Sequence, residues 1–321
     1  RFENLPAPVV ESAKRFILDT IGTALAGSSA PGVKAVLELV IATGGRPEST
    51  LWASSGAQQL PAAAAALANG VMAHARDFDD THDAAIVHAN TSVLPAAFAM
   101  AESRHRSGRD LITAVALGVD LACRMGLAAP ALGGWIHSST LAYFGSTAAA
   151  CKLAACSAEQ TINALGIVYS QVAGNTQCLI EGALSKRMQP AFGARAGLFS
   201  TQLAEKGVTG PRQILEGKYG FFHLYQRGNY SRERLLKDLG THFAGVNLSM
   251  KPYPCCRATH ASIDTILACL AEMSGLAPER IQPGIDGCSA PNFAMPLASA
   301  ALAMARLCDP RGLSEARAAA C

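Results

Sequence analysis

The chain has 321 residues, of which half are hydrophobic and only 6% are aromatic. This length is enough for one large domain and part of a second, since single domains usually contain about 100 to 200 residues. Its 27 basic and 24 acidic residues give a net charge of only +3 and are scattered, which excludes a basic face for nucleic acid.

Eight helices are predicted along the chain. In residues 8–26, apolar side chains such as Val9, Phe16 and Ile17 recur at helical spacing, and Gly27 ends the pattern. The later segments are rich in alanine, which favours helix because it loses no side-chain entropy there. These helices are expected at residues 32–43, 60–74, 92–104, 110–125, 140–155, 158–172 and 191–205.

Strand-like alternation is scarce before Pro252, and its one short candidate is residues 49–53. We therefore predict a mainly α protein, with a large all-helical domain over residues 1–247. The run that begins at Lys251 contains two prolines and must be extended, because residues before proline avoid the helical region. We place the domain junction near residues 245–253 and a smaller α+β domain over residues 248–321.

The ten cysteines do not show the spacing of a small disulfide-bonded domain. Four of them lie inside apolar helical patterns as small core residues: Cys123, Cys151, Cys156 and Cys269. We expect a reducing, cytoplasmic location. The most apolar long stretch, residues 111–136, carries Asp120 and Arg124 and is a poor membrane span, so no membrane partner is predicted.

A run of titratable side chains directly after an alanine-rich helix is the first candidate site. Its members are His74, Asp77, Asp79, Asp80, His82, Asp83 and His88. If the helix continued, Asp77, Thr81 and His88 would share a face with His74, while Asp79 and Asp83 would point away. A histidine near a carboxylate can remove a proton α to a carboxylate or protonate a leaving hydroxyl. We predict catalytic roles for Asp77 and His88, and a hydrogen bond from Thr81 to substrate; the alternative is a solvated acidic helix end.

Two cationic elements are candidates for binding substrate carboxylates. Lys186 and Arg187 precede Pro190, which suits the first turn of a helix, and helix N-termini favour anions. Further along, Lys251 lies in a proline-bracketed turn, and Arg257 enters the helix that follows. The alternative is that these are ordinary basic loops.

Two other enzyme classes stay open. Cys256 and His260 are i,i+4 neighbours near a helix start, where thiols ionise more readily, so they could form a nucleophile and base. His82-Asp83 is a doublet that binds divalent metal in phosphohydrolases, although the residues nearby offer few further ligands. We predict no metal.

Five segments, in the same order and spacing, resemble the MmgE/PrpD family: AKRFILDTIGTALAG, ALANGVMAHARDFDDTH, HANTSVLPAAFA, SKRMQPAFGARAG and KPYPCCRATHASID. The family includes 2-methylcitrate dehydratase, cis-aconitate decarboxylase and iminodisuccinate epimerase. The resemblance implies a large all-helical domain with a smaller α+β lid, a homodimer, and a site in the cleft between the domains without metal or organic cofactor.

The resemblance also implies which residues form the site: Asp77, Thr81, His88, His137, Lys186 and Lys251. His137 enters through the resemblance alone, since its local pattern is that of a helix start. Cys256 stands where the decarboxylase branch has histidine, and Ala89-Asn90 replaces the usual Pro-Ser after His88. These departures favour a dehydratase or an epimerase. The resemblance fades after about Ile285, where the tail lacks the strands of the lid, so we expect a truncated or altered lid.

The sequence therefore predicts a cofactor-independent lyase that dehydrates a small polycarboxylate such as 2-methylcitrate. Lys186 and Lys251, with Arg187 or Arg257, would hold carboxylates and stabilise the charge that develops as the proton leaves. Within the family, the alternatives are an epimerase and a cis-aconitate decarboxylase. From other classes, they are a His-Asp metal phosphohydrolase, a thiol enzyme and a non-catalytic truncated member.

Overall fold

The computed structural model describes residues 1–54, 57–131, 133–285 and 291–319. The chain forms two compact units, Arg1–Pro254 and Cys255–Cys321. The described strands form two two-stranded antiparallel sheets, and helices make up most of the rest. The prediction of a mainly α protein is therefore confirmed.

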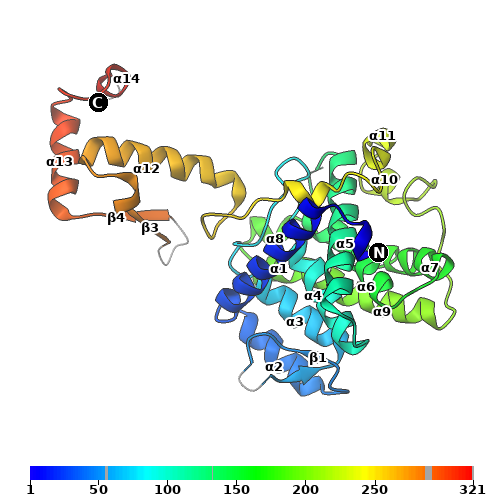
Figure 1. The fold of residues 1–321 in the computed structure, drawn as a ribbon. Coiled ribbons are helices and arrows are strands. Elements are labelled where there is room, and N and C mark those ends of the chain that lie inside the picture. The colour runs from blue at the N-terminus through cyan, green and yellow to red at the C-terminus, as the bar shows by residue number, and fades with distance from the viewer. Residues whose placement is uncertain (55–56, 132, 286–290, 320–321) are drawn as a thin grey trace. The chain divides into compact units, whose positions relative to one another are not determined.

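All eight predicted helices are present in the first unit (Figure 1). They are α1 (Ala7–Gly27), α2 (Val33–Thr43), α3 (Ala62–His74), α4 (Asn90–Ser103), α5 (Gly108–Ala128), α6 (His137–Leu153), α7 (Ala158–Tyr169) and α9 (Gln189–Glu205). The sequence did not predict the short elements, because three to five residues are too few to show a period. These are η1 (Phe2–Asn4), α8 (Gln177–Ile180), η2 (Leu184–Met188), α10 (Phe221–Leu224), α11 (Arg232–Leu236) and η3 (Ala244–Asn247).

A small hairpin stands between α2 and α3. β1 (Ser49–Thr50) pairs antiparallel with β2 (Gln59–Leu60). The predicted strand at residues 49–53 is thus present only at its first two residues. The Glu102 carboxylate, on α4, accepts hydrogen bonds from both residues of β1 and so anchors the hairpin to the helices.

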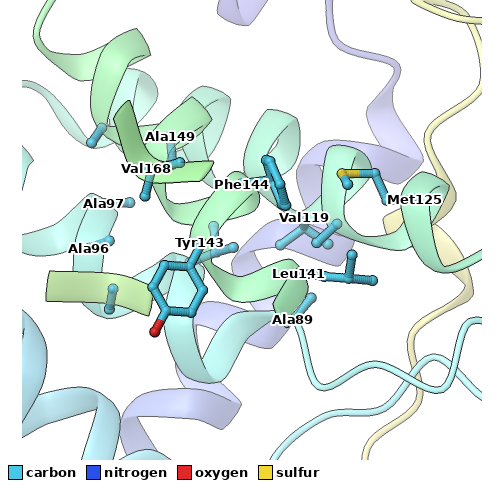
Figure 2. Packing of buried hydrophobic residues seen from close by; sticks show 14 of the residues in the cluster. Ala89, Ala96, Ala97, Val119, Met125, Leu141, Tyr143, Phe144, Ala149 and Val168 are labelled. Carbon is cyan, nitrogen blue, oxygen red and sulfur yellow. The ribbon is translucent and has the colours of Figure 1, made fainter. Parts of the chain in front are cut away.

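The core of the first unit is built around α6, which packs against α4, α5, α7 and α9. Close approach depends on small residues: a Cβ added to Gly118 on α5 would lie 2.6 Å from the Gly145 carbonyl oxygen on α6. Figure 2 shows alanines of this core interleaved with larger side chains such as Phe144 and Met125. The alanine-rich, aromatic-poor composition is thus used for close helix packing.

By length and composition α5 could cross a membrane, but 72% of its apolar window is buried inside the protein. It also carries a buried ion pair, in which Arg124 Nε lies 2.8 Å from Asp120 Oδ2. Arg124 donates further hydrogen bonds to backbone carbonyls between residues 235 and 242, and Asp120 accepts one from the Ala244 N–H. This pair therefore holds the end of the first unit against α5.

The second unit contains helices and one hairpin. Its elements are η4 (Arg257–Thr259), α12 (His260–Ser274), η5 (Pro278–Arg280), β3 (Gln282–Ile285), β4 (Pro291–Ala294), α13 (Leu297–Cys308) and α14 (Glu315–Ala318). α12 packs against α13, and β3 pairs antiparallel with β4. The tail after Ile285 was predicted to lack strands, which is wrong at β4. This strand has only four residues and begins with a proline, so the sequence shows no alternation there. Residues 286–290, which belong to that tail, lie outside the described residues. The assignment of residues 248–321 to a truncated lid stays a prediction.

We expect Arg124→Ala to lower the free energy of unfolding by about 3 to 5 kcal/mol, because it leaves the Asp120 carboxylate buried without its cation. Urea denaturation followed by circular dichroism measures this. The control is Arg212→Ala, which breaks the exposed pair with Glu159 and should cost less than about 1 kcal/mol. Equal losses in the two variants would show that the buried pair does not fix this part of the fold.

Candidate active site

The chain turns where α3 ends, at His74. Asp77 has a positive φ of 55°, and its N–H still donates to the His74 carbonyl, so the residues that follow form a loop. The helix ends at His74 as predicted, so the helical face that was considered for Asp77, Thr81 and His88, on the condition that the helix continued, does not form. Aspartates compete for backbone hydrogen bonds and tolerate the left-handed region better than most residues, which explains why the helix stops here.

The loop carries the Asp77 carboxylate to two lysines from distant parts of the chain. Asp77 Oδ2 lies 2.7 Å from Lys186 Nζ, and Asp77 Oδ1 lies 3.6 Å from Lys251 Nζ. Lys251 also donates to the Asp77 carbonyl at 2.8 Å, and its side chain is fully buried. Lys186 comes from the short helix before α9, and Lys251 from the predicted extended run. The structure thus brings together three of the predicted site residues.

Asp79 also belongs to this cluster. It is completely buried, and its Oδ2 lies 2.8 Å from Nδ1 of the buried His74. Its other oxygen lies 3.8 Å from Lys251 Nζ. The prediction that Asp79 points away from the site was wrong, because it assumed a continuous helix. Asp83, by contrast, is exposed as predicted.

The pKa values of the two aspartates follow from these neighbours. Burial alone would raise the pKa of Asp77, but Lys186, His74 and Lys251 together hold it below its usual value. Burial acts in the same way on Asp79, yet the nearby His74, His88 and Lys251 hold its pKa well below the usual range. Both carboxylates are therefore ionised at neutral pH, facing two ammonium groups.

His88 lies beside this cluster, with its ring centroid 5.7 Å from that of His74. Its Nδ1 lies 2.7 Å from the Asp80 carbonyl oxygen, which can only accept, so Nδ1 carries a proton. Burial, the largest cause, lowers the pKa of His88, which favours a neutral ring whose Nε2 can accept a proton. This is the arrangement that a general base requires.

His137, at the start of α6, is held in the core by two contacts. Its Nδ1 lies 3.1 Å from the Ala85 carbonyl, and its Nε2 lies 3.3 Å from Nε2 of the buried Gln226. Burial lowers its pKa, so the ring is neutral, with Nδ1 as donor and Nε2 as acceptor. The next residue, Ser138, accepts a hydrogen bond from the His88 N–H. His137 is thus connected to His88 through the backbone of α6, and Gln226 gave no signal in the sequence.

Other predicted residues have different neighbours. Thr81 is buried and pairs through its backbone with Ser249, which positions the Lys251 segment beside the loop. Arg187 donates to the Pro31 carbonyl at 2.7 Å and so contacts the turn between α1 and α2. The remaining predicted residues, Arg257, Cys256 and His260, belong to the second unit. There Cys256 is exposed and His260 is buried, with its Nε2 3.4 Å from the Cys255 carbonyl.

Two further acids lie behind the cluster: Asp80, which belongs to the predicted run of titratable residues but had no assigned role, and Asp19, which was not predicted. Asp80 is fully buried and accepts hydrogen bonds from the backbone and side chain of Asn90. Burial, with the charges of Asp79 and Asp19, raises the pKa of Asp80 to about 7. Burial and the Asp79 charge raise that of Asp19 to about 6. These acids therefore titrate in the physiological range.

In the described part of the chain, one group of three side chains could hold a metal ion: His74, Asp77 and Asp79, whose ligand atoms lie within 4.8 Å of one another. The ammonium groups of Lys186 and Lys251 already lie at these carboxylates and would repel a cation. The donor set therefore fits a metal poorly. A cavity of about 630 Å³ lies elsewhere and is lined by residues of β2, α4 and the start of α5.

Residues 1–233 match the MmgE/PrpD N-terminal domain, and this match covers more than two thirds of the chain. The chain belongs to the MmgE/PrpD family. The Asp77, His88, His137 and Lys186 positions all fall inside the matched region.

Curated relatives of this MmgE/PrpD chain are named as cis-aconitate decarboxylases. A cis-aconitate decarboxylase-like protein oryM from Aspergillus oryzae is 33% identical over 82% of this chain and 58% of its own length. The enzyme from Aspergillus terreus is 30% identical over 82% and 56%, and that from Mus musculus is 29% identical over 87% and 58%. The chain thus spans just over half the length of the curated relatives it matches.

A second match involves the end of the chain, where residues 245–321 match L-asparaginase II. The alignment with the mouse protein covers 87% of the chain, so it extends well beyond residue 245 into the same segment. The two similarities therefore overlap around Lys251 and Arg257.

We expect Asp80→Asn to flatten the pH dependence of stability. Folding raises the pKa of Asp80 from about 3.9 to about 7, so its favourable contribution is complete below the unfolded pKa and is lost as pH rises through 7. Asparagine stays neutral and keeps an acceptor for Asn90. Between pH 5 and 8 the free energy of unfolding should fall less in the variant than in the wild type, by on the order of a few kcal/mol. Denaturation at each pH measures this difference.

The control for this experiment is Asp83→Asn, which changes an exposed acid in the same loop and should follow the wild-type profile. Parallel profiles for wild type and Asp80→Asn would contradict the raised pKa.

Proposed function

We propose that this MmgE/PrpD protein is a lyase that acts on a small polycarboxylate by moving a proton at the carbon next to a carboxylate. The observation that carries the proposal is the Asp77 carboxylate held between Lys186 and Lys251. A pair of ammonium groups that already binds one carboxylate has the chemistry to bind the carboxylates of a substrate.

The lysines would act in the transition state as well as in binding. When a proton leaves the carbon α to a carboxylate, negative charge spreads onto the carboxylate oxygens. Fixed ammonium groups in a buried site stabilise this charge without rearranging, which is an effective form of catalysis. Lys251 suits this role because its side chain is fully buried and is held by the Asp77 carbonyl.

The proton would be handled by Asp77 and His88. His88 is neutral and offers Nε2 as base, because its Nδ1 proton is held by the Asp80 carbonyl. Asp77 could accept or return a proton once a substrate carboxylate replaces it at Lys186. His137 would support this pair through Ser138 rather than through a contact with Asp77.

Two reactions fit this chemistry. Dehydration of 2-methylcitrate is the reaction that the sequence favours, since Cys256 and Ala89-Asn90 depart from the decarboxylase pattern. Decarboxylation of cis-aconitate is favoured by the relatives, which carry that name. The match to L-asparaginase II does not include Asp77, His88 or Lys186, so amide hydrolysis is not proposed. The homodimer, the cytoplasmic location and the absence of a cofactor stay predictions.

The deciding experiment incubates the protein with 2-methylcitrate, citrate, cis-aconitate and iminodisuccinate and identifies products by NMR. Loss of water would identify a dehydratase, loss of carbon dioxide a decarboxylase, and inversion at one carbon an epimerase. If a folded protein turns over none of these acids, the lyase proposal fails and the non-catalytic alternative gains support.

We expect His88→Ala to lower kcat by about 100-fold or more, because it removes the base. Lys186→Met should raise KM by about tenfold or more, because it removes a charged hydrogen bond to a carboxylate. The matched controls are His105→Ala and Lys206→Met, which change exposed residues and should leave turnover unchanged. Near-normal kinetics in both site variants would contradict the assigned roles.

A further inference from the structure

In the protein without substrate, the charges of two aspartates and two lysines at the site cancel. Asp77 and Asp79 supply two negative charges, and Lys186 and Lys251 supply two positive charges within 3.8 Å of them. These four side chains therefore carry no net charge among themselves. A bound polycarboxylate would add two or three negative charges to a partly buried site, where uncompensated charge is strongly disfavoured.

His74 is the group best placed to supply the missing positive charge. An ionised carboxylate can only accept hydrogen bonds, so Nδ1 of His74 donates its proton to Asp79. The next proton on this ring must therefore enter at Nε2. A ring nitrogen of His74 and carboxylate oxygens of Asp77 and Asp79 all lie within 4.8 Å of one another. An imidazolium at this position would face two carboxylates.

Binding of a polycarboxylate also frees Asp77. The Asp77 carboxylate occupies Lys186 at 2.7 Å, so a substrate carboxylate that takes this ammonium must displace it. Asp77 then loses its closest cation and keeps Lys251 Nζ at 3.6 Å, while a ring nitrogen of His74 lies within 4.8 Å of it. The position of Asp79 behind the ring stabilises the charged form, as in other carboxylate–histidine pairs.

We propose that His74, held by Asp79, is a proton-binding positioning residue of this site: it takes up a proton from solvent at Nε2 when a polycarboxylate binds, and the imidazolium then balances Asp77. The inference rests on the proposed function in one respect, namely that the site binds a polycarboxylate. It assigns to His74 a role that acts through Asp77, without contact to substrate.

Other titratable groups around His74 could take up the proton instead. His88 lies against the ring, and Asp80 and Asp19 lie behind Asp79 with raised pKa values. Asp80 is the strongest competitor, since its pKa is about 7. The experiment must therefore separate His74 from Asp80.

The test is calorimetric titration of the protein with tricarballylate near pH 7.5, in buffers of different ionisation enthalpy. Tricarballylate has three carboxylates but neither a hydroxyl to eliminate nor the double bond of cis-aconitate, so binding is measured without turnover. The slope of binding enthalpy against buffer enthalpy gives the protons taken up. For the wild type we expect about one proton per site.

In His74→Asn the amide N–H can still donate to Asp79, but the side chain does not titrate. We expect uptake to be lost in this variant, with weaker binding, and retained in Asp80→Asn and in the exposed control His105→Asn. Uptake that persists in His74→Asn, or that disappears only in Asp80→Asn, would overturn the proposal. So would binding to the wild type without uptake.

A second measurement covers the case in which His74→Asn does not fold. In the wild type labelled with ¹⁵N-histidine, tricarballylate should convert one neutral ring to imidazolium, and an unchanged spectrum of the bound protein would overturn the proposal. The outcomes also separate this inference from the lyase proposal. Proton uptake without turnover of any acid contradicts the lyase alone, whereas turnover of an acid by a protein that does not bind tricarballylate contradicts this inference alone.

Discussion

The need to compensate the buried ammonium of Lys251 is the constraint on which the rest of this site depends. At an effective dielectric constant of about 20, two unit charges 4 Å apart interact by about 4 kcal/mol, which is comparable to the cost of burying an ion in a protein. Asp77 and Asp79 supply that compensation at 3.6 and 3.8 Å. Because both come from one loop, the loop must leave the helical path after His74 and place Asp77 in the left-handed region. The backbone pairing of Thr81 with Ser249 then fixes the two segments together.

The compensation has a chemical consequence. In the free protein the lysines hold carboxylates of the protein itself, so the site is preorganised for carboxylate geometry but is already occupied. Under the proposed function, a substrate would have to compete with Asp77, and the displaced Asp77 would become available for proton transfer. Binding and the activation of Asp77 are then one event. Burial and the Asp79 charge raise the pKa values of the acids behind the loop, Asp80 and Asp19, to about 7 and about 6, so we expect stability to depend on pH near neutrality.

The long helices could be predicted from the sequence, because apolar spacing over ten or more residues is a strong local signal. The path of the chain after α3 could not be predicted, because a helical wheel assumes that the chain is helical there. That assumption placed the Asp79 side chain away from the site. The meeting of Asp77 with Lys186 and Lys251 joins residues more than a hundred positions apart, and no local pattern records such a contact. The local sequence around each lysine and the resemblance to MmgE/PrpD enzymes both indicated Lys186 and Lys251 as site residues. Neither could supply the pairing of His74 with Asp79, or Gln226 beside His137, which depend on packing in three dimensions.

We propose that Lys186 and Lys251 form a carboxylate-binding pair, which Asp77 occupies until a substrate binds. A crystal structure of the protein with tricarballylate bound tests this most directly. We expect a ligand carboxylate within hydrogen-bond distance of Lys186 Nζ, with Asp77 moved away from that ammonium and the Asp79–His74 contact retained. A ligand bound elsewhere, or bound with the Asp77–Lys186 pair intact, would contradict it.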